Sequence, residues 1–563
     1  MRFSVILWFV FISAIGQDKY PKDYFRSPLG IATKVSGSFG ELRPNHFHSG
    51  LDFRTDKQEG LPVYASADGF VSRIKISTGG YGKSLYIDHP NGFTTVYGHL
   101  QQCNPEIQKL VNEEHYDKKN YEIEIFLKAN EISVKKGDLI AYSGNTGSSG
   151  GPHLHFEFRD TKTEKVINPL FFGFDADMKD QNPPVINGLL GYSMDDTSQI
   201  NGSNKPVLIP LTLQKDGTYL AGKVLASGKI SFGINAYDTS TESYSKNGIF
   251  KLDTYLNGMP YFGFEFDSFS FDETKYINTF IDYEIYKSQK QRFQKLFLGL
   301  SYPNSIMKIT KNDGIINVST NLNLNYKVIV QDFHGNKTIV NIPISYANLP
   351  IKIKKETNKT PYFLKARNDN SYFKDDISLF IPEKTFNEDF YLKFNVKDNQ
   401  LLLNENAIAV NNHMTITFDV TKIPSEEREK MFIANVSNGI LSYNTTYKKD
   451  DSFSIKTKNL GKFYITSDSI APKIYKPNFE EGSNLDTQKT LQIYISDNLS
   501  GIKTYNAYLN GEWILMEYES KLNRLRHNLS DAIYTNGKNE FKIIVTDNLG
   551  NSTTFESTFT KTK

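Results

Sequence analysis

Cysteine is almost absent from this chain, because Cys103 is the only one among 563 residues. A lone cysteine cannot form an intramolecular disulfide, so each domain must be stabilised by burial of its own core. Net charge is also small, since 65 Lys and Arg residues are balanced by 63 Asp and Glu residues. This balance gives no reason to expect nucleic acid as a partner.

Long apolar runs are absent beyond the first residues of the chain. The run from Phe3 to Gly16 follows Arg2 and ends in small residues, which is typical of a secretory signal peptide, predicted at 1–16. It is shorter than the ~20 residues of a membrane span, so we expect no stable membrane span. No cysteine follows the predicted cleavage point, which disfavours a lipoprotein. We therefore expect an exported protein of the periplasm, the cell envelope or the extracellular space.

Helical periodicity is scarce after Phe174. A linker at 180–184 is followed by short alternating runs separated by turn residues, and the 40 Phe and 33 Tyr residues suit β-rich cores. The length predicts several domains. The predicted fold class is therefore mainly β, with an N-terminal antiparallel β-sheet domain followed by β-sandwich domains.

Two segments of the C-terminal half are similar to each other. Residues 326–336, YKVIVQDFHGN, parallel residues 541–551, FKIIVTDNLGN. Each has a strand, an Asp-containing turn that closes in Gly-Asn, and a final strand. These units resemble the immunoglobulin-like modules of exported bacterial proteins, and we expect one at 183–347 with an insertion and another at 470–563.

A further β-domain of unknown type is predicted between these units, at 348–469. The aspartates of the repeated units could be Ca²⁺ ligands, but we favour turn residues, because Asp commonly serves turns. The residues concerned are Asp238, Asp332, Asp497 and Asp547.

The most informative stretch is GNTGSSGGPHLH at 144–155, where two histidines follow a glycine-rich loop. If a strand follows, side chains alternate, so His153, His155 and Glu157 share one face, opposite an apolar face. Histidine is a common metal ligand and general base. Glu157 could orient an imidazole, but we favour its interpretation as a solvated surface glutamate.

A second cluster lies in NHFHSGLDF at 45–53. On a straight strand His48 and Asp52 would be about 13 Å apart, too far to bind one ion at about 2 Å. The chain must therefore bend, which Gly50 permits. With one of His153 and His155, these residues form a set of two histidines and one aspartate. Such a set suits a catalytic Zn²⁺ with a fourth position left for water.

Another histidine, His99, stands in TVYGHL, after a turn-like Pro-Asn-Gly at 90–92 and a run of alternating residues. It is predicted to end a hairpin strand. Considered alone, it is a polar residue at a strand end.

Together these motifs resemble the lysostaphin/LytM-type zinc endopeptidases, DD-endopeptidase-like enzymes that cut peptidoglycan cross-links. The match runs from about residue 30 to about residue 172, and several motifs occur in the family's order. They are SFG at 38–40, HxxxD at 48–52, GLPVYASADGFV at 60–71, GGYG at 79–82, YGHL at 97–100, VKKGD at 134–138 and HLHFE at 153–157.

The resemblance implies Zn²⁺ as the cofactor, with His48, Asp52 and His155 as its ligands. It also implies that His153 and His99 flank the catalytic water and the scissile carbonyl. We expect His153 to be the general base and His99 to donate a hydrogen bond to the developing oxyanion. The two roles could be exchanged, and the sequence does not distinguish them.

The sequence departs from the compact family pattern in one place. The peptidase domain, predicted at 17–175, carries a charged insertion at about 103–132, with helical spacing at 107–111 and a strand-like run at 121–127. This insertion could wall the substrate groove. His46 has the wrong spacing to Asp52 for a ligand and is interpreted as a groove-wall residue. We expect no N-terminal inhibitory segment.

The expected function is an exported zinc metalloendopeptidase that hydrolyses peptide cross-links of peptidoglycan. Its partners would be peptidoglycan peptide stems and, through the β-domains, other envelope components. One alternative is a catalytically silent wall-binding activator of other hydrolases, which the full set of histidines and Asp52 disfavours. The other is a peptidase of extracellular proteins.

Overall fold

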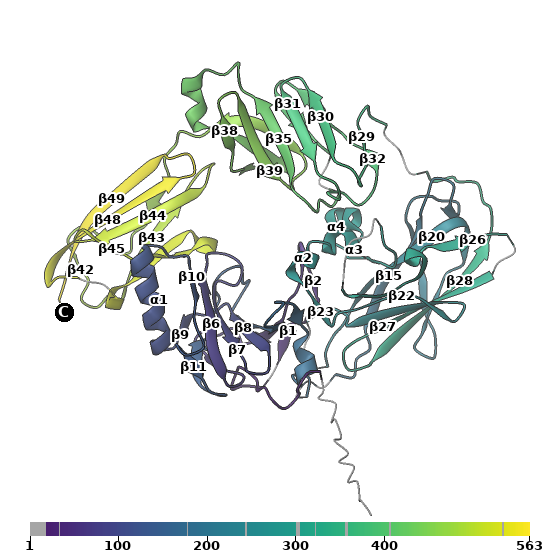
Figure 1. The fold of residues 1–563 in the computed structure, drawn as a ribbon, viewed down its shortest axis with the longest axis horizontal. Helices are drawn as coiled ribbons and strands as arrows, with labels where there is room; N and C mark the ends of the chain where they lie inside the picture. The colour runs from purple at the N-terminus through teal and green to yellow at the C-terminus, as the bar shows by residue number, and fades with distance from the viewer. Residues whose placement is uncertain are drawn as a thin grey trace, which may run out of the picture.

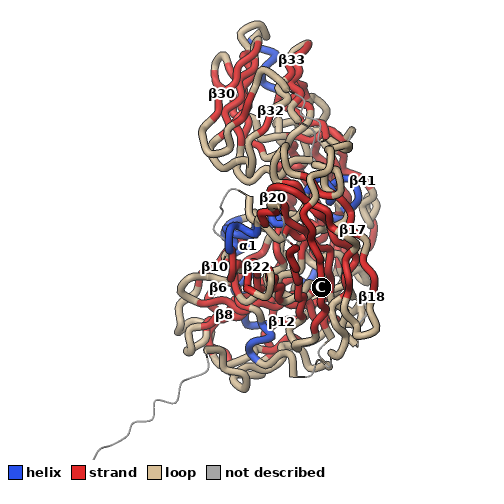
Figure 2. The backbone as a smooth tube through the Cα atoms, turned by 90° about the vertical axis from the view of Figure 1, so that its right-hand side faces the viewer, coloured by secondary structure: helices blue, strands red, loops and turns tan. Residues whose placement is uncertain are grey.

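The structure, a computed structural model, describes residues 19–32, 34–176, 178, 180–241, 245–299, 305–320, 323–354, 359–404, 407–437, 439–531 and 534–562. The predicted signal peptide at 1–16 lies outside these residues. Strands dominate each part of the described chain (Figure 2), which confirms the mainly β fold class. Within the described ranges, no helix combines the length and the apolar character that a bilayer span requires.

The N-terminal part is built on one antiparallel sheet with the strand order β1-β4-β13-β8-β7-β6-β10. Its strands are β1 (Val35–Gly37), β4 (Leu51–Arg54), β13 (His153–Asp160), β8 (Phe93–Gly98), β7 (Lys83–Asp88), β6 (Gly69–Ile76) and β10 (Ile123–Phe126). At its margins, β11 (Ser133–Val134) pairs with β6, and β14 (Val166–Ile167) pairs with β13. On β13, Leu154, Phe156 and Phe158 are fully buried in the core, as the predicted alternation requires.

Smaller elements complete this part. They are the sheet of β5 (Pro62–Tyr64), β12 (Leu139–Tyr142) and β9 (Gln102–Cys103), the hairpin of β2 (Leu42–Arg43) and β3 (His46–Phe47), and the 3-10 turn η1 (Pro169–Phe172). The insertion folds as α1 (Pro105–Lys118) and β10, which confirms its predicted helical and strand-like patterns. The helix begins there because the Asn104 side chain accepts the N–H of Ile107 at 2.9 Å.

The next part is a mixed sheet with the order β17-β15-β20-β28-β27-β21-β22-β25. These strands are β17 (Val207–Ile209), β15 (Val185–Ser193), β20 (Val224–Tyr237), β28 (Lys337–Tyr346), β27 (Asn323–Gln331), β21 (Lys251–Leu256), β22 (Met259–Glu265) and β25 (Met307–Thr310). Short helices lie within it, α2 (Phe271–Thr274), α3 (Ile277–Phe280) and α4 (Tyr283–Gln289). Strand β23 (Ser268–Phe269) pairs with β14, so this part extends the N-terminal sheet.

Two pairs of sheets follow, each around its own apolar core. The first pair contains β30 (Asn370–Lys374), β31 (Ile377–Ile381), β35 (Met414–Asp419), β39 (Ser452–Thr457) and β38 (Tyr447–Lys449), facing β33 (Asn395–Lys397), β34 (Gln400–Leu402), β40 (Lys462–Ser467), β36 (Met431–Ser437) and β37 (Ile440–Tyr443). The second contains β41 (Lys473–Tyr475), β43 (Thr490–Ser496), β47 (Arg524–Asn528) and β46 (Glu517–Glu519), facing β42 (Ser483–Asn484), β49 (Ser552–Lys561), β48 (Gly537–Asp547), β44 (Ile502–Leu509) and β45 (Glu512–Ile514). The immunoglobulin-like assignment and the predicted domain limits stay predictions.

The parts are arranged in a closed ring, and the C-terminal strands return to the N-terminal part beside α1 (Figure 1). Lys83 Nζ donates to Glu517 Oε1 across this junction at 2.7 Å. The Tyr116 ring of α1 packs edge-on against Trp513, with ring centroids 5.4 Å apart. The insertion therefore provides part of the surface on which residues 470–562 dock.

Candidate functional site

Strand register places the predicted site residues next to one another. On β13, His155 lies opposite Asp52 of β4 on one side and opposite Gly98 of β8 on the other. His99 directly follows Gly98, so the end of β8 delivers a second imidazole to the same place. The segments around 48–52, 99 and 153–155 therefore meet at one end of the sheet.

The predicted bend between His48 and Asp52 is present. Strand β3 ends at Phe47 and β4 begins at Leu51, with His48 and Gly50 between them. A Cβ at Gly50 would lie 2.2 Å from the backbone oxygen of Phe156, so only glycine allows the bent chain to approach β13 this closely. The bend lets both side chains reach one point.

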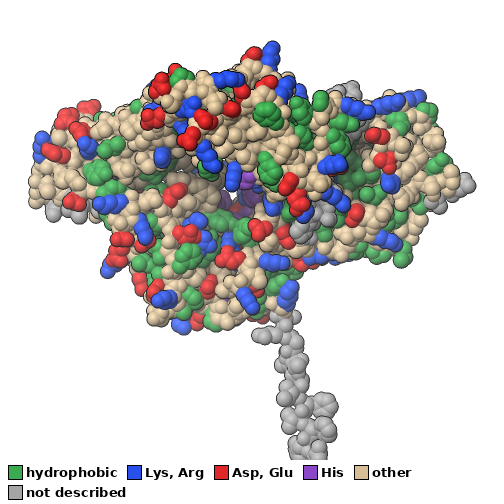
Figure 3. Space-filling model, turned by 45° about the horizontal axis from the view of Figure 1, so that its top comes forward, with side chains coloured by type: hydrophobic (Ala, Val, Ile, Leu, Met, Phe, Trp, Pro, Cys, Tyr) green, Lys and Arg blue, Asp and Glu red, His purple; other side chains and the backbone are tan. Residues whose placement is uncertain are grey.

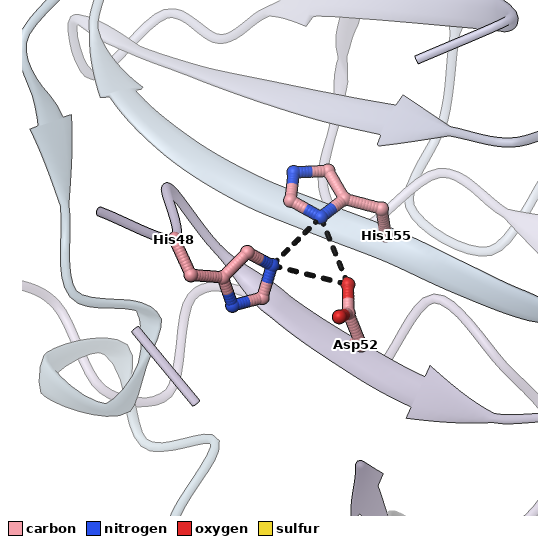
Figure 4. A group of neighbouring side chains, drawn as sticks. All are labelled: His48, Asp52 and His155. Carbon is pink, nitrogen blue, oxygen red and sulfur yellow. Dashed lines mark hydrogen bonds and ion pairs between the residues drawn. The ribbon is translucent and has the colours of Figure 1, made fainter. Parts of the chain in front are cut away.

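Three ligand-type atoms converge at that point (Figure 4). His48 Nε2 lies 3.1 Å from Asp52 Oδ1 and 3.1 Å from His155 Nδ1. His155 Nδ1 lies 2.9 Å from Asp52 Oδ1. A tetrahedral zinc with bonds of about 2.0 Å separates its ligand atoms by about 3.3 Å, so these side chains need to move little to bind one.

Each of the two imidazole rings, His48 and His155, makes a hydrogen bond through the nitrogen that points away from the convergence point. These bonds favour tautomers in which the other nitrogen directs its lone pair toward that point. His48 Nδ1 is 2.7 Å from the carbonyl oxygen of Ser38, which can only accept, so this nitrogen carries a proton. His155 Nε2 is 2.8 Å from a carboxylate oxygen of Glu157 and donates to it. In the neutral forms, two imidazole lone pairs and a carboxylate oxygen then face one another. This donor set fits a cation such as Zn²⁺.

Burial and charge determine how these groups titrate without a metal ion. Burial lowers the pKa of His48 to about 4, although Asp52 opposes that shift. Burial also lowers the pKa of His155, but hydrogen bonds to Asp52 and Glu157 outweigh it and raise that pKa to about 9. Without a metal ion, His155 therefore holds a proton at neutral pH, which an incoming metal ion must displace.

The preferred interpretation of Glu157 as a solvated surface residue is wrong, because its side chain is fully buried. Its second carboxylate oxygen accepts from Arg159 Nε at 2.8 Å, while the first accepts from Ser49 Oγ at 2.5 Å and from the Tyr81 hydroxyl. Burial raises the pKa of Glu157, but Arg159 and His155 hold that pKa well below its usual value. Glu157 is therefore a charged partner that orients His155.

Arg43 is a site residue that the sequence motifs did not indicate. Its Nη2 donates to Asp52 Oδ2 at 2.5 Å from the hairpin of β2 and β3. This bond occupies the outer carboxylate oxygen and leaves Oδ1 directed at the two imidazoles. His46 lies on the same hairpin, is exposed, and contacts the carbonyl oxygen of Pro44 at 2.9 Å.

The two auxiliary histidines stand beside the three ligand-type atoms. His153 Nε2 lies 3.4 Å from Asp52 Oδ1, and the His99 and His153 rings have centroids 4.7 Å apart. His99 has a φ of 59°, an uncommon backbone conformation for a residue with a side chain. Its Nδ1 contacts the carbonyl oxygen of Thr146 at 2.9 Å. Burial, then the neighbouring His155 and His153, lower the pKa of His99 to about 3.

The glycine-rich loop of 144–151 connects the site to the C-terminal part of the chain. Lys521 Nζ donates to the carbonyl oxygens of Asn145 at 2.8 Å and Ser149 at 2.6 Å. The same loop carries the Thr146 carbonyl bound to His99. Residues of the insertion, the loop and 515–528 line a groove of about 630 Å³. In Figure 3, histidine side chains are visible in a hollow near the centre of the view.

Comparison with known proteins assigns families to two parts of the chain. Peptidase family M23 matches residues 46–116 and 121–169, and a Zu5-like domain matches residues 361–468. The Zu5-like match falls within the β-domain whose type the sequence left open.

Individual relatives match the same N-terminal part. An uncharacterized metalloprotease of Haemophilus influenzae is 35% identical over 158 residues, covering 26% of this chain and 27% of the relative. The peptidoglycan DD-endopeptidase ShyC of Vibrio cholerae is 32% identical over 143 residues, covering 24% and 27%. A crystal structure of a zinc-containing peptidase from Vibrio cholerae is 27% identical, covers 28% of this chain and 40% of that one, and has a TM-score of 0.20.

The chain thus spans only about a quarter of the length of these curated relatives. The matched residues nevertheless include the HxxxD, YGHL and HLH motifs that carry the predicted resemblance. The resemblance is thereby confirmed, and the chain contains a domain of peptidase family M23.

Proposed function

We propose that this protein is an exported, zinc-dependent endopeptidase that hydrolyses peptide cross-links of peptidoglycan. The convergence of His48 Nε2, Asp52 Oδ1 and His155 Nδ1 within 3.1 Å of one another carries the proposal. Family M23 membership of residues 46–169 and the name of the Vibrio cholerae relative, a peptidoglycan DD-endopeptidase, support the substrate class.

The proposed ligands are those three residues, and the bound Zn²⁺ would supply an activated water and polarise the scissile carbonyl. Arg43 and Glu157 position two of the ligands from outside. Arg43 holds the second oxygen of Asp52, and Glu157 holds the far nitrogen of His155. Such outer partners fix the orientation of a ligand and, for histidine, its tautomer.

The hydrogen bonds of His99 and His153 are alike, so the expected roles of these histidines stay as they are. The Thr146 carbonyl keeps the proton of His99 on Nδ1, so a lone pair remains on Nε2. Its low pKa makes neutral His99 a weak base near pH 7. We therefore keep His153 as the proposed general base.

His153 offers the lone pair that a general base needs. Its Nδ1 lies 2.8 Å from the carbonyl oxygen of Gly151, which can only accept, and Ser149 Oγ donates to that same carbonyl oxygen at 2.7 Å. The proton of neutral His153 is therefore on Nδ1, and the lone pair of Nε2 is available to accept a proton from water. His99 stays the proposed donor to the oxyanion, a role that requires a proton on its Nε2.

The β-rich remainder of the chain has a proposed role in placing the peptidase domain. Residues 470–562 contact the peptidase domain through Lys83 and Glu517 and through Lys521, next to the groove. We assign to residues 183–347 and 348–469 contacts with envelope components. A peptidase of extracellular proteins is the competing assignment, and both assignments share the same catalytic residues.

The test is a digest of purified sacculi with the zinc-loaded protein, followed by separation of the muropeptides. Cross-linked dimers should decrease and monomers should increase, and the His155→Ala variant should leave the profile unchanged. Sacculi that bind the zinc-loaded protein but keep their cross-links would favour the silent activator. An unchanged profile together with cleavage of an unstructured protein such as casein would favour the extracellular peptidase.

A further inference from the structure

Aspartates recur at equivalent positions in the two repeated units and in the segments that lead into them. The first aspartate of each unit lies four residues before a proline. The second directly follows a strand. The third lies four residues before the asparagine that closes a turn. In the first unit these are Asp180, Asp238 and Asp332, and in the second they are Asp468, Asp497 and Asp547. The strand before the middle aspartate is β20 in the first unit and β43 in the second.

The same hydrogen bonds frame both sets. Asn336 Nδ2 donates to Asp332 Oδ2 at 2.7 Å and to the carbonyl oxygen of Asp180 at 3.2 Å. In the second unit, Asn551 Nδ2 donates to Asp547 Oδ2 at 2.6 Å and to the carbonyl oxygen of Asp468 at 3.0 Å. The turn asparagine therefore fastens the first and third aspartates together in both units.

In the first unit, ligand-type atoms of Asp180, Asp332 and His334 lie within 4.8 Å of one another. Asp238 lines the same cavity as Asp180 and His334, and burial together with the charges of Asp180 and Asp332 raises the pKa of Asp238 to about 7. Its side chain is only 7% exposed, and its Oδ1 has no hydrogen-bond partner among the described residues. Asn247, 9% exposed, lines the same cavity and also has an unpartnered Oδ1 within the described part of the chain.

In the second unit, ligand-type atoms of Asp468, Asp497 and Asp547 lie within 4.8 Å of one another. The Oδ1 of Asp497 is buried and lacks a partner among the residues that the structure describes. Ser500 is 2% exposed, its N–H donates to Asp468 Oδ2 at 3.0 Å, and its Oγ has no partner within the same described residues. The turn interpretation accounts for the bonded oxygens of these aspartates but not for the buried ones that stay unpaired.

Neither set is neutralised by a basic side chain. Across the described ranges, none of the six carboxylates forms an ion pair with Lys or Arg, although Lys430 Nζ reaches the carbonyl oxygen of Leu549 nearby at 2.8 Å. Grouped, buried carboxylates and unpartnered oxygens are costly unless a cation binds them. Clusters of carboxylate, amide and hydroxyl oxygens carried by irregular turns suit Ca²⁺, which accepts flexible coordination by oxygen, better than Zn²⁺ or Mg²⁺.

We propose that the chain binds two Ca²⁺ ions, one at each of these aspartate clusters. Asp180 belongs to the linker after the peptidase domain, and Asp468 ends the Zu5-like region. Each ion would therefore fasten the segment entering a repeated unit to two turns of that unit. The ions would stabilise two junctions of the ring, independently of the peptidase chemistry.

The test is equilibrium dialysis of the full chain, loaded with zinc, against ⁴⁵Ca²⁺ in buffer otherwise free of divalent cations. Wild type should bind two Ca²⁺ per chain, Asp238→Asn one, Asp497→Asn one, and the double variant none. Asp216→Asn is the matched control, because Asp216 also bonds a turn threonine, Thr218, but is exposed and outside both clusters. This control should bind two.

A thermal unfolding series of wild type with increasing CaCl₂ gives a second readout that needs no variant. Tm should rise with Ca²⁺ and should not rise with equal MgCl₂. Folded wild type that binds no Ca²⁺ at millimolar concentration would overturn the proposal, as would a double variant that still binds two. If the variants do not fold, the stoichiometry and Ca²⁺ dependence of wild type decide the question.

Discussion

Glu157 gives the sharpest prediction about how the proposed zinc ligands are supported. Its carboxylate lies between His155 and Arg159, fully buried, with Nε2 of His155 at 2.8 Å and Nε of Arg159 at 2.8 Å. In Glu157→Gln, an amide of the same shape can still accept from His155 but no longer carries the charge that strengthens the ligand. Removal of such an outer partner typically weakens metal binding about 10–100-fold, or about 1.4–2.7 kcal/mol.

The same substitution should also destabilise the metal-free protein, because it leaves the buried guanidinium of Arg159 without its main partner. Removal of one member of a buried ion pair costs about 3–5 kcal/mol, and the retained amide oxygen favours the lower end. Glu164 offers a matched control, because it also contacts Arg159, at 3.3 Å, but its side chain is 65% exposed. Glu164→Gln should change stability by less than about 1 kcal/mol and leave zinc affinity unchanged.

Competition for zinc with a chromophoric chelator at pH 7 measures the first effect, and urea unfolding of the metal-free protein measures the second. A Glu157→Gln variant whose zinc affinity stays within twofold of wild type would refute the reasoning, because Glu157 would then not orient His155. Equal losses of unfolding free energy in Glu157→Gln and Glu164→Gln would show that burial of the Glu157–Arg159 ion pair does not affect stability.

Three further predictions concern the ligands, the loop and the pH dependence. His48→Ala should abolish stoichiometric zinc by elemental analysis, whereas His46→Ala should retain it, and the reverse pattern would overturn the ligand assignment. Lys521→Ala removes two hydrogen bonds to the glycine-rich loop, which are worth about 1 kcal/mol together, so kcat/KM should fall roughly fivefold. The control variant Lys503→Ala, at an exposed lysine, should keep the wild-type kcat/KM. Equal activities of the two variants would show that the loop keeps its conformation without Lys521. The folded pKa of His99, about 3, lies below the unfolded value of about 6.5, so the unfolded state binds more protons between these values and stability falls as pH decreases. Between pH 7 and 5 the His99 share of this loss should reach about 2 kcal/mol in urea unfolding of the metal-free protein. The loss should therefore be smaller by about that amount in His99→Gln, where only the share of other groups such as His48 remains. Equal losses in wild type and His99→Gln would contradict this prediction.

Local sequence patterns predicted the parts of the site that neighbouring residues determine. The alternation in HLHFEF predicted which side chains of β13 enter the core, and Gly50 predicted the bend that brings His48 to Asp52. The helical spacing after Asn104 predicted α1. These features depend on residues only a few positions apart, so periodicity and turn chemistry suffice to find them.

Contacts between distant residues could not be read in this way. The burial of Glu157 depends on partners from other elements, Ser49 and Tyr81, although the Glu-x-Arg spacing to Arg159 on the same strand face was an available signal. Glu517 and Lys521 reach the peptidase domain from more than 370 positions away in the chain. No local pattern indicates such a contact, because it depends on how the ring closes.

The most direct test of the central claim is mass spectrometry of a purified, cross-linked muropeptide dimer incubated with the zinc-loaded protein. Cleavage of one peptide bond should convert the dimer into two monomers whose masses sum to that of the dimer plus one water, and Asp52→Ala should leave the dimer intact. An intact dimer in the presence of fully zinc-loaded, folded protein would contradict the account. Equal cleavage by Asp52→Ala would contradict the proposed site.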